Sequence, residues 1–535
     1  MFTEHTSKFE ASGEYILLLF LFFFAVFSIF LRGIPTGGDE WGMYLVAQSI
    51  VEDGDVYLDD SDIVVLRQGA GGRWVSKYGI GQSLVEAPVY LFARMFARGA
   101  DDALRESIRY FVTSFVSPAI GAGVCVFVFL ICCELGYLFS TALFITFLTG
   151  LGSLVWPYSK TVFSEPLQAM CITAAFYFLI KWRARHACGH AAPAGFLLGL
   201  LVATKPYMLL AVAPFVFFLL GGLRGSGGRT ARAGVFVFFA MLVSWIGIEI
   251  FYNYLRFGDP MQFGYLGGAD RDAVHGFSLP LLVGLHGLLF SSGKGLIFYV
   301  PAVALSVFAF RTFARKRRAE AWVIGAVFII VVLAYSKWNA WHGDFAWGPR
   351  FLMPVVPLLL IPAGALLEEV PFFRRAAGRS IVAVLFAVSV FIQIPGSAVN
   401  YNEYLVISKT QVPFHVFFKP GRVGLRDDML NVHYIPEFSP FAGHYWLLRH
   451  TLFDRDLPRS RANEVMKNDY PWKSLMPYAP PGDPARGLGF DAWWFYYLKY
   501  FPGTSDWVYR LAAVLIFIAT VSGAGIAFGA MRKRE

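Results

Sequence analysis

The chain has 535 residues, of which 56% are hydrophobic, 17% aromatic and only 16% charged. Long apolar runs recur from one end to the other, which excludes a soluble globular protein and indicates a polytopic membrane protein. The net charge of +9 does not indicate a nucleic-acid ligand. Its basic residues fall mainly in short loops between apolar runs, where they orient the chain in the bilayer.

The first apolar run, residues 14–32, is long enough to cross a bilayer. No small-residue cleavage site follows it, so we expect it to remain as an anchor. The stretch "PTGGDEWGMYL" comes next and places Asp39 and Glu40 in the first turn outside the membrane. In the simplest explanation, Asp39 caps a helix that begins at Trp41, because aspartate accepts backbone N–H bonds there. A capping aspartate beside a membrane cavity would also be a rigidly held carboxylate.

We expect an all-α fold of about twelve transmembrane helices, and the positions of Lys and Arg test this topology. The expected spans are 14–32, 106–132, 137–157, 164–181, 190–204, 206–221, 233–254, 296–310, 321–338, 351–367, 380–396 and 506–530. The basic residues of alternate loops then share one side: Lys181, Arg183 and Arg185; Arg224, Arg229 and Arg232; Arg311, Arg315, Lys316, Arg317 and Arg318; Arg374, Arg375 and Arg379; and the tail "MRKRE". The positive-inside rule makes this side, with both termini, cytoplasmic.

Two segments are assigned with the help of that rule. Residues 82–97 are apolar but short, interrupted by Pro88, and carry Glu86 and Arg94. A full crossing there would turn every basic loop outward, so we interpret the segment as interfacial or re-entrant. The run 190–221 is too long for one crossing, and "TKP" at 204–206 predicts two short helices that meet at the outer face.

Three polar segments are expected outside the cytoplasm: 33–105, 255–295 and 397–505. In the first, apolar residues from Met43 to Val51 repeat with helical spacing, which predicts a helix lying along the membrane surface. The expected organisation is a transmembrane catalytic module, 1–396, with 33–105 as its first outer loop. An extracytoplasmic loop or small subdomain, 397–505, follows, and 506–535 form the last span and a basic cytoplasmic tail.

Further ionisable residues are expected at the same outer face: Glu165 in "VFSEPL", Lys205 in the TKP corner, Lys77 with Tyr78 in "SKYGIGQSL", and Arg350 in "FAWGPRFL". Each has a structural explanation. Lys205 can snorkel, Arg350 can anchor the interface, and Glu165 can complement a helix dipole. Charged groups near spans are costly, however, so several on one side of the membrane indicate a functional cavity.

Transfer of a sugar from a lipid phosphate requires this combination of groups. The acceptor hydroxyl loses a proton as it attacks the anomeric carbon, which asks for a carboxylate base. The leaving group is a phosphate, whose charge is stabilised by Lys or Arg. The polyprenyl chain of the donor needs an apolar groove that opens to the bilayer.

The motifs resemble those of membrane-embedded glycosyltransferases of the GT-C superfamily, which includes bacterial aminoarabinose transferases and protein O-mannosyltransferases. The resemblance rests on "PTGGDEWGMYLVAQSIVEDGD", "SKYGIGQSLVEAPVYLFA", "VFSEPLQAM", "GLLVATKPYMLL" and "WNAWHGDFAWGPRFLMPVVP", which occur in the family's order over about residues 14–370. A weaker similarity continues in "SPFAGHYWLL" and "FDAWWF". The chain departs from the aminoarabinose transferases where "KYGIG" stands in place of Lys followed by two prolines, which puts the role of Lys77 in doubt.

The resemblance implies a polyprenyl-phosphate-sugar donor, inversion at the anomeric carbon and a site at the outer surface of a bacterial inner membrane. By position, Asp39 would be the base and Glu165 a second acid that orients the acceptor or, in some relatives, a divalent metal. Lys205, with Lys77 or Arg350, would hold the donor phosphate, while Glu40 would support the site through a backbone N–H or a cation, and Tyr78 is a further supporting candidate. The acceptor would be a cell-envelope glycan, lipid or protein.

Other functions remain open at the level of sequence. A transporter or lipid flippase would also need charges within the membrane, but more often shows internal repeats and short loops on both sides. A polysaccharide polymerase or ligase shares the lipid-linked donor, and a non-catalytic scaffold is a third alternative. The histidines do not have a zinc-ligand spacing, so no metal site is predicted from them. The glycine-rich stretches match neither a Walker pattern nor a dinucleotide fingerprint.

Overall fold

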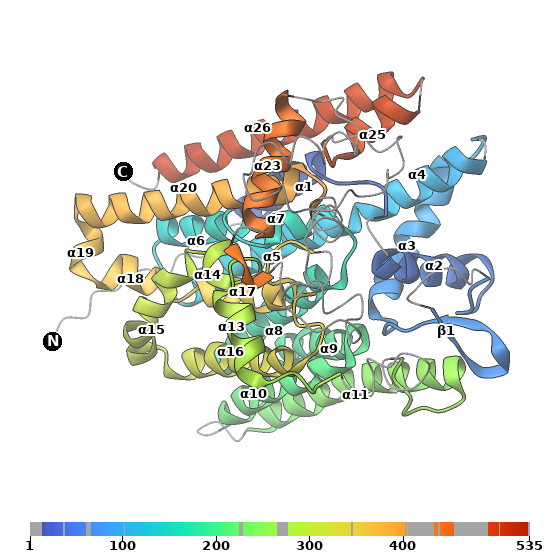
Figure 1. The fold of residues 1–535 in the computed structure, drawn as a ribbon. Helices are drawn as coiled ribbons and strands as arrows, with labels where there is room; N and C mark the ends of the chain where they lie inside the picture. Colours follow the sequence, from blue (N-terminus) through green and yellow to red (C-terminus); the bar gives the residue numbers. More distant parts are fainter. Residues whose placement is uncertain are drawn as a thin grey trace.

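The computed structural model describes residues 13–35, 38–59, 66–100, 102–223, 228–264, 276–343, 346–401, 404, 433–436, 439–453, 490–501 and 503–532. The described chain is a bundle of helices with a single antiparallel hairpin, formed by β1 (Leu66–Gln68) and β2 (Trp74–Ser76) (Figure 1). Leu66 pairs with Ser76 and Gln68 with Trp74.

Each of the twelve expected spans coincides with helical structure. In the first half of the chain the helices are α1 (Gly13–Ile29), α2 (Gly38–Glu52), α3 (Gly81–Phe96), α4 (Asp102–Ser114), α5 (Val116–Glu134), α6 (Phe139–Leu151), α7 (Val155–Tyr158), α8 (Ser164–Arg185), α9 (Cys188–Thr204), α10 (Leu209–Gly221) and α11 (Arg229–Phe257). In the second half they are α13 (Leu281–Phe290), α14 (Leu296–Tyr299), α15 (Val303–Lys316), α16 (Arg318–Lys337), α17 (Val356–Leu360), α18 (Ala363–Glu369), α19 (Pro371–Arg374), α20 (Ala376–Ala398), α23 (Pro440–Phe453), α25 (Trp493–Tyr500) and α26 (Ser505–Arg532). Short 3-10 turns cover 70–72, 206–208 and 350–355.

Several helices are long and apolar enough to cross a bilayer. Six of them meet this condition by length and composition: Leu104–Glu134, Arg229–Phe257, Arg318–Lys337, Arg350–Glu369, Ala376–Ala398 and Ser505–Arg532. Large apolar side chains on the outer helices face away from the bundle, including Phe236 and Phe251 on α11 and Phe517 and Phe528 on α26. An apolar surface of this extent would be unfavourable in water, so the chain is a multi-pass membrane protein. The number twelve stays a prediction.

Residues of the expected basic loops contact one another at one end of the bundle, which we call the basic end. Lys181 pairs with Glu134 at 3.5 Å, and Lys316 pairs with Glu369 at 3.1 Å. The Arg183 guanidinium donates to the Phe218 carbonyl at 2.8 Å. The first and last described helices, α1 and α26, pack along each other with Tyr15 next to Gly529. That all the basic loops and both termini are cytoplasmic stays a prediction.

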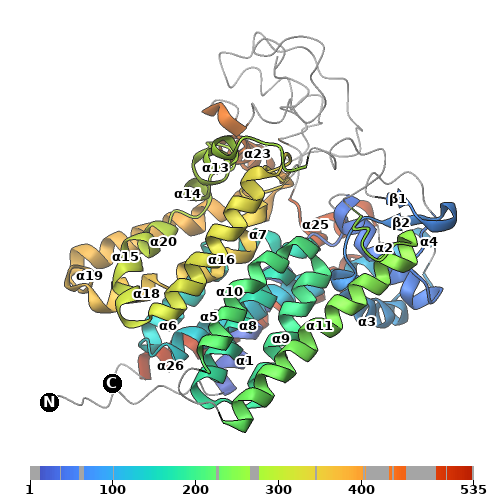
Figure 2. The ribbon, with the colours of Figure 1, turned by 90° about the horizontal axis from the view of Figure 1, so that it is seen from below.

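Helix α8 connects the basic end to the opposite end, because Glu165 stands in its first turn and Lys181 near its last. At 1.5 Å per residue the two side chains are separated by about 24 Å along the helix axis. Figure 2 shows α9, α10, α11 and α16 side by side, with α2, α3 and the β1–β2 hairpin gathered at one end of the bundle. The hairpin, α2 and α3 thus lie together at one end of the bundle, and their placement outside the cytoplasm stays a prediction.

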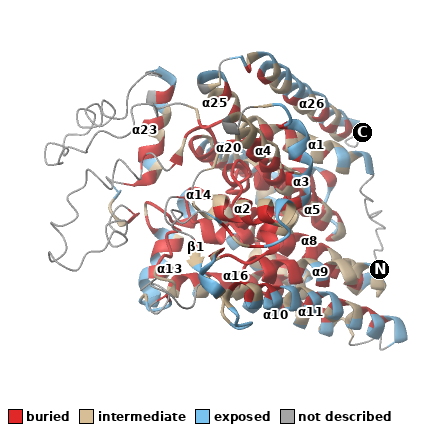
Figure 3. Cartoon of the chain, turned by 90° about the vertical axis from the view of Figure 1, so that its right-hand side faces the viewer, coloured by how far each residue is buried: buried red, intermediate tan, exposed pale blue. Residues whose placement is uncertain are grey.

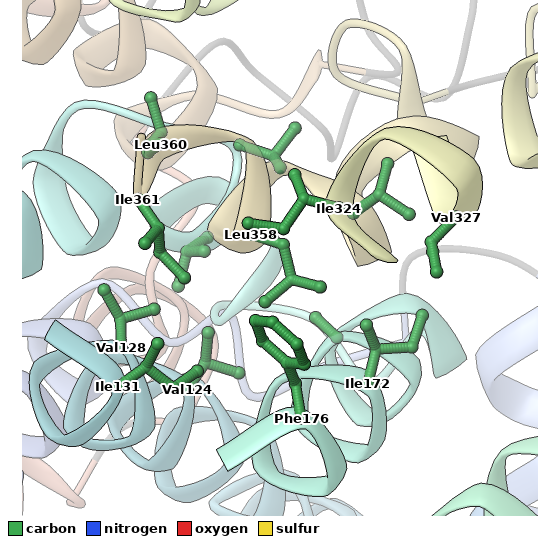
Figure 4. Packing of buried hydrophobic residues seen from close by; sticks show 14 of the residues in the cluster. Val124, Val128, Ile131, Ile172, Phe176, Ile324, Val327, Leu358, Leu360 and Ile361 are labelled. Carbon is green, nitrogen blue, oxygen red and sulfur yellow. The ribbon is translucent and has the colours of Figure 1, made fainter. Parts of the chain in front are cut away.

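The core is formed by apolar faces of α5, α8, α16 and α17. Val124, Val128 and Ile131 of α5 approach Leu358 and Ile361 (Figure 4). Ile172 and Phe176 of α8 lie beneath Ile324 and Val327 of α16 in the same view. Buried residues fill the middle of the bundle, whereas α10, α11 and α26 expose much of their outer surface (Figure 3). The burial pattern is that of a rigid bundle whose periphery faces lipid.

The two segments assigned with the positive-inside rule are largely helical, and the interfacial or re-entrant placement of 82–97 stays a prediction. Residues 82–96 lie in α3, which buries Tyr90 and Ala93 on one face and exposes apolar side chains on the other. The run 190–221 divides into α9 and α10, with Lys205 in extended conformation between them. Of the 397–505 segment, the structure describes 397–401, 404, 433–436, 439–453 and 490–501, and the expected subdomain as a whole lies outside the described residues.

Candidate active site

Helix α2 carries the adjacent carboxylates at its start. It begins at Gly38, so Asp39 lies within its first turn and the expected helix start at Trp41 is three residues too late. Met43, Val46 and Ala47 bury one face of the helix, which confirms the apolar stripe seen in the sequence. Because α2 packs along α3, the direction of Asp39 is set by a buried interface. Asp39 keeps 29% of its side chain exposed.

Arg350 links Asp39 to Glu165. Its Nη2 atom donates to Oδ2 of Asp39 at 3.2 Å, and its Nε atom lies 3.3 Å from Oε1 of Glu165. The guanidinium also lies over the rings of Phe163 and Phe351, at 4.8 and 5.0 Å from the ring centroids. Glu165 and Arg350 are almost fully buried. Three residues that are 126 and 185 positions apart in sequence, Asp39, Glu165 and Arg350, thus form one chain of charges.

The loop before Arg350 is anchored by hydrogen bonds to its backbone. The Lys294 ammonium donates to the Ala346 carbonyl at 2.6 Å, and the Tyr158 hydroxyl donates to the Trp347 carbonyl at 2.7 Å. Gly348 has a φ of +54° and packs against the Tyr299 ring, so a side chain there would be strained and would clash. These contacts fix where the guanidinium of Arg350 is presented.

Tyr78, Lys77 and Lys205 surround the other side of Asp39. The Tyr78 hydroxyl donates to Oδ1 of Asp39 in a short hydrogen bond. The Lys205 ammonium lies 5.6 Å from the Tyr78 ring centroid, and the Lys77 ammonium lies 5.4 Å from it. Both ammonium groups act electrostatically on Asp39. The TKP corner and the KYGIG loop therefore meet at the same carboxylate.

Glycine makes this meeting sterically feasible. A Cβ atom on Gly79 would clash with the Ala203 carbonyl, and one on Gly81 would clash with the Thr204 hydroxyl. The backbone of the KYGIG loop can therefore lie directly on the end of α9 only because these positions lack side chains. The glycines that distinguish this chain from the aminoarabinose transferases thus have a packing role next to Lys205.

The electrostatic surroundings keep Asp39 ionised. Burial raises the pKa of its carboxyl, but Arg350, Lys77, the Tyr78 hydrogen bond and Lys205 together lower it below the ordinary value of 3.8. Opposite charges and donors to the charged form account for this direction. The Asp39 carboxylate is therefore available as a proton acceptor throughout the neutral range.

Glu40 points away from Asp39 and binds the backbone. Its Oε2 atom accepts a hydrogen bond from the Val162 amide at 3.1 Å and another from the Tyr110 hydroxyl at 3.0 Å. Val162 comes three residues before Glu165. The hydrogen bond from its amide to Glu40 therefore connects the start of α2 to the segment that precedes α8. This backbone bond is one of the two arrangements considered for Glu40 from the sequence.

Arg256 donates hydrogen bonds to the backbone of the KYGIG loop and was not predicted from the sequence as a site residue. Its Nη1 atom donates to the Ser76 carbonyl at 2.6 Å and to the Tyr78 carbonyl at 2.8 Å. Glu249 belongs to the same helix, α11. Its Oε2 atom accepts a hydrogen bond from the Ile80 amide at 3.1 Å, and its Oε1 atom lies 3.7 Å from Nη2 of Arg256. The signal that could have found this pair is a glutamate within the apolar run of a span, because such residues are costly in the membrane.

A second buried ionic cluster was also missed. Asp491, just before α25, pairs with Arg32 at 3.1 Å and with Lys160 at 2.9 Å. Lys160 also donates to the Val399 carbonyl at 2.8 Å. The cluster joins the end of α1, the segment before α8, the end of α20 and the start of α25. Arg32 follows the first span on the side where basic residues are depleted, which was the available signal.

The site does not suit a divalent metal. Among the described residues, no three His, Cys, Asp or Glu side chains come together as a metal site would require. The two carboxylates of the site are those of Asp39 and Glu165, and the guanidinium of Arg350 contacts both of them. A cation placed there would be repelled by that guanidinium, so we derive no catalytic step through a metal.

Comparisons with known proteins match solved structures but no family. No protein-family model matches the chain, and no curated protein matches it. The solved structures that match include two of ArnT from Cupriavidus metallidurans. The one bound to undecaprenyl phosphate is 14% identical, covers 85% of this chain and 75% of its own, and has a TM-score of 0.49. The apo structure is 13% identical, covers 83% and 79%, and has a TM-score of 0.47.

Proposed function

We propose that the chain is a membrane glycosyltransferase that moves a sugar from a polyprenyl-phosphate donor to an acceptor hydroxyl. The observation that carries the proposal is the chain of charges Asp39–Arg350–Glu165, flanked by Tyr78 and two lysines, at one end of an apolar bundle. A carboxylate base and cations for a phosphate leaving group are the two requirements of this reaction.

Asp39 is the general base in this proposal. As the acceptor oxygen forms its bond to the anomeric carbon, its proton passes to the Asp39 carboxylate. The bond between the anomeric carbon and the phosphate oxygen breaks, and its electron pair leaves with the lipid phosphate. Attack from the face opposite to the phosphate inverts the anomeric configuration. Because the hydroxyl becomes acidic as the new bond forms, a carboxylate with a lowered pKa can still accept the proton.

Lys77 and Lys205 stabilise the departing phosphate. Both ammonium groups lie near the ring of Tyr78, whose hydroxyl donates to Asp39. Lysine binds phosphate as a point charge, and in a partly desolvated site its attraction is stronger than in water. The expectation that Arg350 also contacts the phosphate stays a prediction. Its observed partners give it a further role, which is to hold both carboxylates.

Glu165 orients the acceptor in this proposal. Its Oε2 atom is buried and has no hydrogen-bond partner among the described residues. A buried carboxylate oxygen without a donor is unfavourable, and an acceptor hydroxyl would supply one. The other oxygen, Oε1, contacts Arg350. The acceptor hydroxyl would therefore bind between the carboxylates of Glu165 and Asp39, both of which contact Arg350.

The proposed location follows from the position of the site relative to the basic end. Glu165 and Lys181 lie at opposite ends of α8, and the positive-inside rule assigns the basic end to the cytoplasm. The active site then faces the extracytoplasmic side of a bacterial inner membrane. The acceptor is a cell-envelope glycan, lipid or protein that carries a hydroxyl.

A direct test replaces Asp39 with Asn, which keeps the shape of the side chain and removes the base. The variant is reconstituted with polyprenyl-phosphate sugars, and transfer to envelope acceptors is followed by mass spectrometry. We expect loss of transfer by about 100-fold or more with unchanged folding, the scale of general-base catalysis. Asp53→Asn, an exposed aspartate after α2, is the matched control and should keep full activity.

Full transfer by Asp39→Asn would rule out its role as the base. Uptake of a labelled solute or movement of a lipid by the wild-type protein in vesicles, without transfer, would instead favour the transporter or flippase.

A further inference from the structure

A cavity of about 450 Å³ lies between α3 and α4, apart from the proposed active site. Its polar lining consists of four arginines and its apolar lining of three smaller side chains: Arg94, Arg98, Arg105 and Arg109, with Leu91, Met95 and Ala97. Asp39 and Glu52 stand near opposite ends of α2, about 20 Å apart along its axis. Glu52 contacts this cavity through Arg109, so the cavity and Asp39 lie at different ends of the same helix.

The arginines of the cavity pair with carboxylates of α2 and α4. Arg109 pairs with Glu52 at 3.2 Å and lies 3.7 Å from Glu106, and Arg94 lies 3.8 Å from Glu52. Arg105 donates to the Ala100 carbonyl at 2.7 Å. Among the described residues, two carboxylates, Glu52 and Glu106, therefore lie within ion-pair distance of these arginines.

Two of the arginines have unused capacity to bind an anion. The Nε atom of Arg109 is buried without a hydrogen-bond partner among the described residues. Arg98 is exposed at the rim and forms no ion pair with a described carboxylate. A guanidinium presents several donors in a planar fork that suits phosphate oxygens. The cavity thus has both the charge and the donors that a phosphate group requires.

An apolar ridge runs beside the cavity on α3. Leu91, Phe92, Met95 and Phe96 each expose more than half of their surface, and Phe92 and Phe96 contact each other edge to face. Leu91 and Met95 belong both to the ridge and to the cavity wall. An amphipathic helix with aromatic and aliphatic residues on one face and arginines beside them lies at the bilayer interface, with its apolar face in the acyl region.

We propose that this cavity binds the phosphate head group of an anionic membrane lipid, whose acyl chains lie along the α3 ridge. A free phosphate would use the arginines but not the ridge, whereas a lipid uses both. Arg98 and the buried Nε atom of Arg109 supply the donors for the phosphate oxygens, and the ridge supplies the apolar surface for the acyl chains. The binding site is independent of glycosyl transfer and goes beyond the proposed function.

Native mass spectrometry of the full-length chain in neutral detergent tests the proposal. The protein is titrated with phosphatidylglycerol or with phosphatidylcholine, and the bound lipids are counted. The decisive variant is Arg98→Gln with Arg105→Gln, neither of which belongs to the proposed catalytic machinery. We expect one bound phosphatidylglycerol to require about 30-fold more lipid in this variant, the loss expected for two basic residues at an anionic surface.

Matched variants separate this cavity from other sites. Arg510→Gln removes an exposed arginine near the start of α26 and should bind lipid like the wild type. Arg98→Lys with Arg105→Lys keeps the charge and should retain most of the affinity, which excludes misfolding as the cause of the loss. Equal binding of phosphatidylglycerol by the Gln double variant, or of phosphatidylcholine by the wild type, would overturn the proposal. Complete displacement by millimolar inorganic phosphate would also overturn it, because it would indicate a site for free anions.

Discussion

Replacement of Arg350 by Gln should change the pH dependence of transfer, and not only its rate. Arg350 is the largest of the influences that lower the pKa of Asp39, with its Nη2 atom 3.2 Å from Oδ2. Without it, burial raises the pKa against only Lys77, Lys205 and the Tyr78 hydrogen bond. The general base must be ionised, so activity is lost as the pH falls through the pKa of Asp39.

The size of the shift follows from the contact that is removed. A neighbouring arginine lowers an aspartate pKa by about 1–3 units. A rise of about two units corresponds to about 2.7 kcal/mol of lost preference for the ionised form. The acid limb of the wild type should lie below the ordinary value of 3.8. In Arg350→Gln the acid limb should move to higher pH, because the largest influence that lowers the pKa of Asp39 is then missing.

Initial rates of sugar transfer from a polyprenyl-phosphate donor, measured from about pH 9 down to the lowest pH at which the protein stays folded, show whether the variant loses activity at a higher pH than the wild type. Arg350→Lys keeps a positive charge and should shift the limb less than Gln does. Arg510→Gln controls for loss of a positive charge elsewhere. An Arg350→Gln variant with measurable activity and a wild-type acid limb would refute the reasoning, because the guanidinium would then have no electrostatic hold on the base.

Two further substitutions test the supports of the site. Arg256→Lys keeps a charge beside Glu249 but loses the paired donation to the loop carbonyls. It should lower kcat/KM about tenfold with little change in the melting temperature, as expected for a misplaced active-site loop. A fall in kcat/KM that is accompanied by a lower melting temperature would contradict a positioning role. Asp491→Asn leaves Arg32 and Lys160 as buried unpaired cations. It should reduce the free energy of unfolding by about 3–5 kcal/mol in heat-denaturation assays of the detergent-purified protein, and a wild-type melting curve would contradict this.

The order of the helices was predictable because apolar runs and basic loops are local signals. The division of 190–221 at the TKP corner needed only the length of a span and one Lys-Pro pair. Helix α2 was predicted from the spacing of Met43 and Val46, although its first residue was placed too late. Helix termini are set by local capping contacts, which one sequence specifies poorly.

The partners of the site residues were not predictable from the sequence. Asp39, Glu165 and Arg350 were expected at one face, but the bridge through one guanidinium depends on how α2, α8 and the 350–355 turn pack. Arg256 acts on the KYGIG loop across 178 residues, a distance that no motif spans. Residue type restricts which groups can pair, whereas three-dimensional packing decides which of them do.

The balance of charge separates the proposed active site from the structural clusters. Arg32 and Lys160 form ion pairs with Asp491 and also interact electrostatically with Glu40. That cluster therefore contains two cations and two carboxylates. Arg256 and Glu249 are matched one to one. Around Asp39, by contrast, Arg350, Lys77 and Lys205 outnumber Asp39 and Glu165 by one positive charge.

Buried or half-buried charge is costly unless it is paired, and the structural clusters meet this condition within the chain itself. In the function that we propose, the phosphate of a membrane lipid adds negative charge beside the cations around Asp39. These cations then stabilise the leaving group most strongly when the phosphate gains charge in the transition state.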